Sequence, residues 1–221
     1  RWLLAPGLTT TIGSTTPRTR SSSQAAGRAR TCASAIATSL KTSAKRSIAA
    51  ARNAGFAAAR GEIVGFVDAD MQIHPGTFDA IDRALASDRI VGGATGCTLE
   101  RWSLGLAVTY ALFIPMVWLT RFDTGVVFCR RRDFEATGGY DESLRVAEDV
   151  GFLFALRRVG RKQGKRLTRL RHVKAVASTR KFDEYGDWHY LTTIPRLAVG
   201  LVVRRPAVLE EIERYWYEPR R

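Results

Sequence analysis

The stretch "GEIVGFVDADMQIHP", from Gly61 to Pro75, combines a short apolar run with two acidic residues. The run Ile63–Val67 carries no polar side chain, and it leads directly to Asp68 and Asp70. A continuous apolar run of this length, bounded by turn-forming residues, is typical of a strand that is buried on both faces. Such strands occur in largely parallel sheets that helices cover on both sides. The stretch therefore predicts a central strand of an α/β domain, with acidic side chains at its carboxyl end.

Apolar periodicity on both sides of this strand predicts further elements. Helical spacing runs from Ser47 to a stop at Gly61, and it occurs again through Phe78, Ile81 and Leu85. Strands are expected at residues 89–93 and 124–129, and a helix at residues 147–159. Alternating strands and helices favour an α/β fold with a mostly parallel central sheet flanked by helices.

Length and composition indicate a globular protein. The chain has 221 residues, of which 45% are hydrophobic, and this is enough for one sizeable core. The three cysteines have neither metal-ligand spacing nor the even number of a disulfide framework, so they predict reduced thiols in a cytoplasmic protein.

The positive charge is concentrated at the start of the chain. The net charge is +14, yet no acidic residue precedes Glu62, whereas ten of the 35 Lys and Arg residues do. Residues 1–46 are rich in Ser, Thr, Ala and Arg and lack clear periodicity. We expect this irregular segment to be disordered or to be an out-of-frame reading of a GC-rich gene. A basic balance favours nucleic acid or anionic lipid, but the chain has no nucleic-acid-binding motif, and we expect no nucleic acid partner.

An uncharged stretch, Leu104–Thr120, resembles a membrane segment in composition but not in length. A span needs about 20 apolar residues, and Pro115 interrupts this run. We expect a buried helix or a helix that lies at an interface, and the second alternative would associate the protein with a membrane at its periphery.

Two groups of acids are candidates for chemistry. Residues i and i+2 of an extended segment point to the same side, so Asp68 and Asp70 are expected to converge on one divalent cation. The alternative is that they cap the following turn. Glu148 and Asp149 open an otherwise apolar helix, where a carboxylate can act as a general base. The alternative for this pair is a favourable interaction with the helix dipole.

Five motifs together resemble the family-2 glycosyltransferases of GT-A fold. They are Ala51-Arg52-Asn53-Ala54-Gly55, Ala58-Ala59-Arg60-Gly61-Glu62, Asp68-Ala69-Asp70, Gly138-Gly139-Tyr140-Asp141-Glu142 and Glu148-Asp149. The resemblance covers residues 47–190 and leaves residues 191–221 as a helical, basic tail. It implies an inverting enzyme that transfers a sugar from a nucleotide-diphosphate donor to an acceptor hydroxyl, with Mg²⁺ or Mn²⁺ as cofactor. The acceptor would be a carbohydrate or a lipid-linked molecule.

The resemblance also implies roles for the acids. Asp70 would bind the metal ion directly, and Asp68 would contact the ribose or reach the ion through water. Asp149 would be the base that deprotonates the acceptor, and Glu148 would orient the acceptor. Adjacent helical residues diverge by about 100°, so we expect only one of these last two acids to face the reacting hydroxyl.

Other candidates each have a simpler alternative. His172 would be a third metal ligand, or a surface or hydrogen-bonded histidine. Arg180 and Lys181 would neutralise the donor diphosphate, or they would be solvated. Arg52 and Asn53 would reach the nucleotide, or they would only end a helix face.

One part of the family pattern is missing. The family's first strand and its acidic second strand end, which bind the base and the ribose, have no counterpart in residues 1–46. A second function therefore stays open, in which the chain is an inactive remnant that acts as a binding module.

Overall fold

The computed structural model describes residues 10–14, 47–120, 122–123, 125–144, 147–191 and 193, and for residues 10–14 it describes the backbone alone. The expectations for residues 1–46 and 191–221 therefore lie almost entirely outside the described residues. The chain forms two compact units. The first comprises Arg1–Thr98 and Thr120–Ala177, and the second comprises Leu99–Leu119 and Ser178–Arg221.

A six-stranded sheet organises the first unit, in the order β1-β2-β5-β4-β6-β3. The strands are β1 Thr10–Ser14, β2 Ile63–Val67, β3 Met71–Gln72, β4 Ile90–Leu99, β5 Val127–Arg130 and β6 Arg166–Ala177. β2 has the bounds that the apolar run predicts, and β4 and β5 overlap the predicted strands. The sequence pattern does not predict β1, β3 or β6.

The expectation of a mostly parallel sheet is wrong, because the sheet is mixed. β5 runs antiparallel to both of its neighbours, β2 and β4, and the pairs β1–β2 and β3–β6 are also antiparallel. β4 and β6 run parallel, since Arg89 bonds to Arg166 and, further along, Gly93 lies against Thr168. A continuous apolar run indicates that both faces of a strand are buried. It carries no information about the direction of the neighbouring strands.

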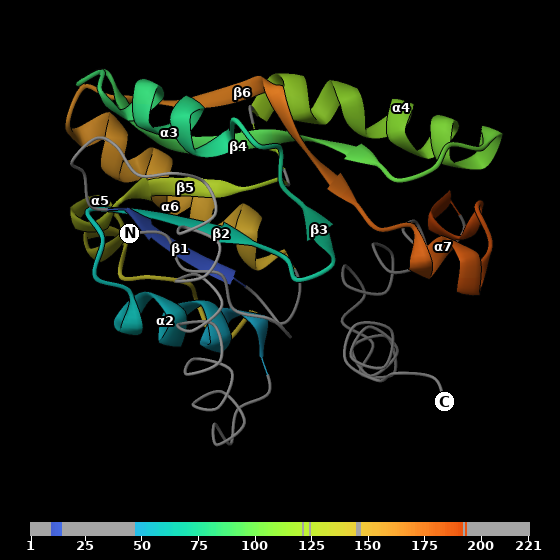
Figure 1. The fold of residues 1–221 in the computed structure, drawn as a ribbon, viewed down its shortest axis with the longest axis horizontal. Helices are drawn as coiled ribbons and strands as arrows, with labels where there is room; N and C mark the ends of the chain where they lie inside the picture. Colours follow the sequence, from blue (N-terminus) through green and yellow to red (C-terminus); the bar gives the residue numbers. More distant parts are fainter. Residues whose placement is uncertain are drawn as a thin grey trace, which may run out of the picture. The chain divides into compact units, whose positions relative to one another are not determined.

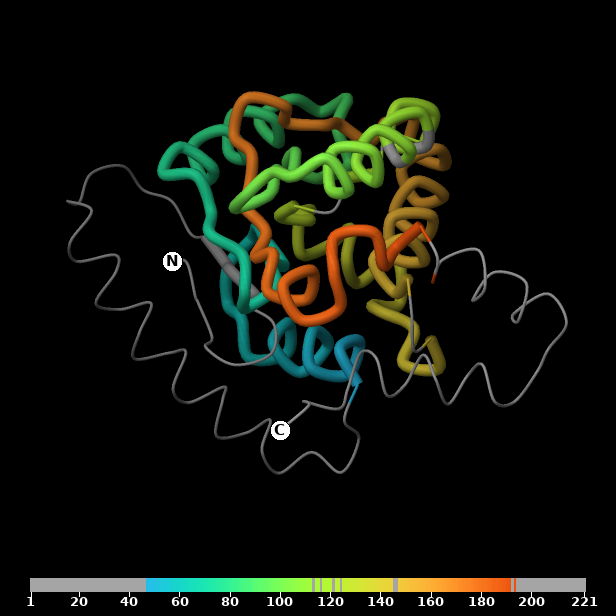
Figure 2. Tube along the Cα trace, turned by 90° about the vertical axis from the view of Figure 1, so that its right-hand side faces the viewer, coloured from blue at the N-terminus to red at the C-terminus, as the bar shows by residue number. Residues whose placement is uncertain are grey.

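Helices cover both faces of this sheet. They are α2 Ile48–Ala58, α3 Thr77–Leu85, α5 Arg131–Thr137 and α6 Glu148–Lys162. Figure 1 and Figure 2 both show α2 and α3 on opposite sides of the sheet. α2, α3 and α6 confirm the predicted helices, whereas the sequence pattern does not predict α5.

Alternating side chains of β5 divide the interior into two apolar cores. Val127 and Cys129 pack into a core with residues of α2, α5 and α6, and Phe128, between them, packs into a second core with residues of α3. Successive side chains of a strand point to opposite faces, and this produces the division. The functional residues described below lie beside the first core.

Local signals explain where α2 begins. The Ser47 hydroxyl oxygen accepts a hydrogen bond from the Ala50 backbone N–H at 3.1 Å, which satisfies one of the free donors of the first turn. This start places the side chain of Arg52 in the second turn of the helix. The cap thus helps to set the position of the most important cation of the site.

The second unit contains α4 Leu104–Thr120, apart from its last residue, and α7 Arg180–Tyr185. α4 coincides with the uncharged stretch. In this unit the Arg101 guanidinium bonds to Asp183 at 2.8 Å and to Asp187 at 2.7 Å. None of the helices in the described part of the chain has both the length and the apolar character that crossing a membrane requires.

Candidate active site

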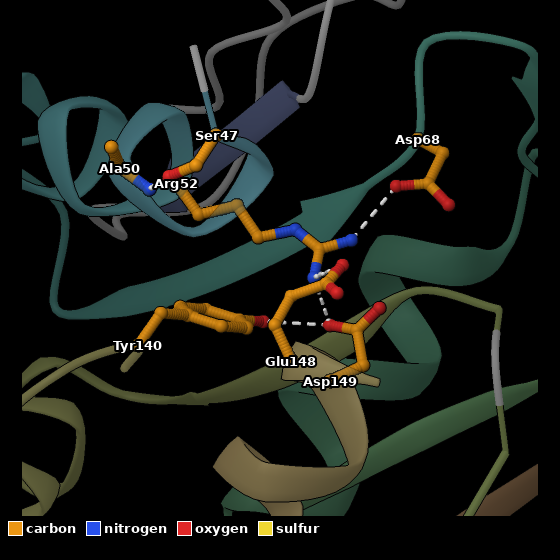
Figure 3. A network of polar contacts seen from close by, with 7 residues as sticks. All are labelled: Ser47, Ala50, Arg52, Asp68, Tyr140, Glu148 and Asp149. Atoms are coloured by element: carbon orange, nitrogen blue, oxygen red, sulfur yellow. Dashed lines mark hydrogen bonds and ion pairs between the residues drawn. The ribbon is translucent and has the colours of Figure 1, made fainter. Parts of the chain in front are cut away.

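Four predicted site residues form one cluster, in which three acids surround the guanidinium group of an arginine. Arg52 comes from α2, Asp68 follows β2, and Glu148 and Asp149 form the start of α6. Figure 3 shows the Arg52 side chain extending between the three carboxylates, with Asp68 on one side and the α6 pair on the other. The fold therefore joins the acid that ends the central strand to the two acids that open a helix.

The contacts are direct. Arg52 Nη2 lies 2.8 Å from Asp68 Oδ1, and Arg52 Nη1 lies 3.2 Å from Glu148 Oε1. Arg52 Nη1 also donates to Asp149 Oδ1. One positive charge thus faces three carboxylates, and the cluster keeps a negative balance when all three are ionised.

Arg52 is buried to an unusual degree for an arginine, with 2% of its surface exposed. Its Nε is buried without a hydrogen-bond partner, and its guanidinium lies 5.0 Å from the centre of the Tyr140 ring. Burial by itself lowers the pKa of Arg52, but Tyr140 and the three carboxylates outweigh it and raise the pKa above its ordinary value. The guanidinium is therefore a permanent charge in the site.

Asp149 receives two hydrogen bonds on the same oxygen. Its Oδ1 accepts from Arg52 and, at 3.1 Å, from the Tyr140 hydroxyl. The other carboxylate oxygen points away from both donors (Figure 3). Burial raises the pKa of Asp149 above its ordinary value of 3.8, Arg52 opposes this rise, and Asp68 adds to it. A carboxylate with a raised pKa and one oxygen without a bonded donor is suited to accept a proton.

Glu148 and Asp149 both reach Arg52, so the start of α6 brings both acids to the cluster. Which of them faces the reacting hydroxyl stays a prediction. Both bond to the same nitrogen, Nη1. The two residues lie at the very start of α6, and Ala147 before them has a left-handed backbone, with φ 59°. Angular divergence around a helix axis separates side chains on a long helix. It does not keep two flexible carboxylates from one large cation at the helix end. Burial raises the pKa of Glu148 as well.

Asp68 and Asp70 do not lie on the extended segment that the sequence predicts, because they are in a turn that follows β2. Their convergence on one cation stays a prediction. The chain turns after β2, and the Met71 N–H bonds to the Asp68 carbonyl oxygen at 3.1 Å. The Asp68 carboxylate is directed to Arg52, whereas Asp70 is exposed in the turn. The described residues include no group of three or more His, Cys, Asp or Glu side chains that is arranged to hold a metal ion.

Asn53 organises a loop within the protein. Its amide nitrogen donates to the Tyr140 carbonyl oxygen at 2.9 Å and to Glu142 at 3.1 Å, and its amide oxygen accepts from the Tyr140 N–H at 2.9 Å. A Cβ on Gly139, where φ is 83°, would lie 2.9 Å from that amide oxygen. The Gly-Gly-Tyr motif is thus held in place by the neighbour of Arg52.

The remaining candidates are His172, Arg180 and Lys181. His172 is an exposed residue of β6, four positions before Val176, which pairs with Gln72. An extended strand covers about 13 Å in four residues, so His172 is not brought to the two aspartates. Arg180 and Lys181 begin α7 in the second unit. Their role towards a diphosphate stays a prediction.

Tyr140 is the site residue for which the sequence analysis assigns no role. It is 2% exposed, its ring stacks on Phe152 at 4.4 Å between centroids, and its hydroxyl bonds to Asp149. The sequence feature that could have identified Tyr140 is its place in the Gly-Gly-Tyr-Asp-Glu motif, where a side chain with a hydroxyl group follows two turn-forming glycines.

Comparison with protein families gives this site its context. Residues 28–133 match the family model described as glycosyl transferase family 2. The chain therefore resembles this family over these residues. The match supports a glycosyltransferase that uses a nucleotide sugar and an acceptor, and the layered sheet and helices agree with the GT-A-like α/β fold that the family implies.

The family match has clear bounds. It includes Arg52, Asp68 and Asp70 and ends before Tyr140 and the α6 acids. It begins within the irregular first segment, at residue 28. No curated protein matches the chain.

Proposed function

We propose that this protein is a family-2 glycosyltransferase, an inverting enzyme in which Asp149 is the general base and Asp68 and Asp70 lie at the donor diphosphate. The single observation that carries the proposal is the Arg52 cluster. It places an acid from the end of β2 and the acids from the start of α6 around one buried guanidinium. This is the arrangement that a transfer between a donor and an acceptor needs, because a leaving group and a base must face the same sugar carbon.

The chemical step follows from these roles. The acceptor oxygen attacks the anomeric carbon as the Asp149 carboxylate takes its proton. The bond from that carbon to the donor diphosphate breaks, and its electron pair leaves with the nucleoside diphosphate. Attack from the side opposite the leaving group inverts the anomeric centre. Glu148 would hold the acceptor through its second oxygen, since its first bonds to Arg52.

The acids after β2 fit a hard divalent cation. Asp68 is 40% exposed at its side chain and uses one oxygen for Arg52, and Asp70 is exposed beside it. Mg²⁺ in proteins is usually held by one or two carboxylates, with phosphate oxygens and water completing its shell. Asp70 and Asp68 would hold Mg²⁺ or Mn²⁺ in this way. When bound, the ion neutralises charge that develops on the departing diphosphate.

The test is a panel of nucleotide sugars, scored by release of free nucleoside diphosphate with and without Mn²⁺ and by the anomeric configuration of the product. Metal-dependent release with inversion supports the proposal. An inactive remnant would bind a nucleoside diphosphate, or an acceptor, without any release. Retention of configuration would contradict the role of Asp149 as a base.

The first testable prediction concerns the donor end of the site. Asp70→Ala should weaken Mn²⁺-dependent binding of a nucleoside diphosphate at least 10-fold, while the thermal unfolding temperature stays the same, because an exposed turn residue contributes little packing. Isothermal titration with and without Mn²⁺ measures this. Asp79→Ala, at an exposed acid of α3, is the control. Equal Mn²⁺-dependent affinities of wild type and Asp70→Ala would remove Asp70 from the site.

The second prediction concerns α4, which we propose to lie at a membrane surface and to serve a lipid-linked acceptor. Several of its large apolar side chains are exposed, among them Leu112 and Trp118 at 62% each and Leu119 at 86%. An apolar helix with this exposure favours insertion into the headgroup region of a bilayer. Expressed protein should associate with membranes and be released by alkaline carbonate. Trp118→Lys with Leu119→Lys should reduce the bound fraction several-fold. Resistance to carbonate, or no effect of the lysines, would contradict this placement.

A further inference from the structure

The hydroxyl group of Tyr140 is the one polar atom of an otherwise apolar ring cluster. The ring contacts Phe66 at 5.1 Å in an edge arrangement and Phe152 at 4.4 Å in a stacked one. Its hydroxyl leaves this cluster towards α6 and donates to Asp149 Oδ1 at 3.1 Å. Burial raises the pKa of Tyr140 well above its ordinary value, so the phenol stays protonated and remains a donor.

Arg52 contacts both Tyr140 and Asp149. It lies over the face of the Tyr140 ring at 5.0 Å and donates to the same Asp149 oxygen. Its other terminal nitrogen bonds to Asp68. The two donors come from α2 and from the loop before α6, and Asn53 holds that loop against α2. Both donors are thus fixed by the surrounding packing before any substrate binds.

We propose that Tyr140 and Arg52 are positioning residues that hold Oδ1 of Asp149 and leave its other oxygen as the one that takes the acceptor proton. The inference rests on the proposed function, because it presumes that Asp149 is the base. A carboxylate free to rotate presents either oxygen in many orientations. Two fixed donors on one oxygen select a single orientation, and a pre-oriented base lowers the cost of reaching the transition state.

The same contacts set the basicity of Asp149. The charged and titratable groups that face it are Arg52 from α2, Asp68 after β2, Tyr140 from the loop and Glu148 beside it. Both hydrogen-bond donors favour the ionised carboxylate, and they oppose the effects of burial and of Asp68. Removing the Tyr140 hydroxyl should therefore shift the acid limb of the activity profile to higher pH.

The test is Tyr140→Phe, which keeps the ring and removes only the hydroxyl. Turnover at neutral pH should fall about 10-fold, as expected for the loss of one hydrogen bond to a charged group. The acid limb of kcat/KM should move to higher pH, and donor affinity should stay within about 2-fold. In the Asp149→Asn background the same change should have little further effect on turnover, because the two residues act as a unit.

A direct readout separates this inference from the proposed function. Carbon NMR of labelled aspartate, with Asp149→Asn to assign the signal, should show a higher Asp149 pKa in Tyr140→Phe than in the wild type. An unchanged NMR titration and acid limb, in a folded Tyr140→Phe protein, would overturn the positioning role. Additive losses in the double variant would also overturn it, because they indicate a purely structural effect. If the NMR shift occurs but Asp149→Asn turns over normally, the proposed base is wrong, and the positioning role falls with it.

Discussion

Asp149→Asn is expected to lower the turnover of sugar transfer by about 10²–10⁴-fold, the range that general-base catalysis contributes. Asparagine keeps the size of the side chain and can still accept hydrogen bonds from Arg52 and Tyr140 through its amide oxygen. It cannot accept a proton at neutral pH. Donor affinity should therefore be retained while the chemical step fails, and transfer rates measured beside donor titrations will separate the two.

The matched control is Glu148→Gln, which alters the neighbouring acid on the same guanidinium nitrogen. It should mainly raise KM for the acceptor and leave most of the turnover in place. In the wild type, the acid limb of kcat/KM should lie above the ordinary aspartate value of 3.8, since burial raises the pKa of Asp149. Activity rises with pH through this limb because the base must be ionised. Normal turnover of Asp149→Asn together with a large loss in Glu148→Gln would reverse the two roles.

Arg52→Leu is expected to destabilise the first unit by about 3–5 kcal/mol at neutral pH, the usual result of removing one partner from a buried ion pair. The side chain is 2% exposed and supplies the positive charge to three carboxylates. Leucine fills part of the volume and leaves these acids without a counter-charge. Urea unfolding at pH 7 and pH 4, followed by circular dichroism, measures the loss.

The loss should be smaller at the lower pH. Arg52 lowers the pKa of Glu148 and of Asp149 in the folded protein, so its removal raises both further. A folded pKa above the unfolded value contributes stability that is present below the unfolded pKa and is lost as pH rises through the folded pKa. The difference in the free energy of unfolding between the wild type and Arg52→Leu therefore grows from about pH 4 towards neutrality.

Arg101→Leu is the control for this prediction, because Arg101 also pairs with two aspartates but is 38% exposed at its side chain. Exposed ion pairs contribute little to stability, so its effect should be far smaller and should decrease with added salt. Equal losses for the two variants would show that Arg52 is not the centre of a buried cluster.

Local patterns in the sequence were sufficient for several elements. The run Ile63–Val67 became β2 with those bounds, and the uncharged stretch Leu104–Thr120 became α4. Both depend on the composition of consecutive residues, and this determines a strand or a helix before any packing occurs. The sequence pattern does not predict β6 because its buried residues Leu167, Leu170 and Val173 are three positions apart, with basic residues between them, and do not show the period-two alternation of a strand.

Sheet direction and the geometry of the acids depended on interactions that no local pattern contains. β5 enters the sheet between β2 and β4 and runs antiparallel to both, although its own residues are equally suited to a parallel neighbour. Asp68 and Asp70 lie in a turn after β2, because the backbone bond from Met71 to Asp68 ends the extended segment. The direction of β5 and the turn after β2 are therefore favoured only when the rest of the first unit packs around them.

The amino-acid sequence by itself determined which acids lie at the boundary of an element, with Asp68 after β2 and Glu148 and Asp149 at the start of α6, because apolar runs and turn residues are local signals. Only the tertiary structure decided that one arginine joins them, across 16, 96 and 97 positions of the chain. In the sequence Arg52 is a candidate that would reach the nucleotide or would only end a helix face, and nothing local links it to the three acids. Its burial, its pairing with all three acids and the approach of Tyr140 arise when α2, β2 and α6 pack on one core. Burial excludes the water that would otherwise solvate and separate these charges, and so the fold assembles a site from residues that have no local relation.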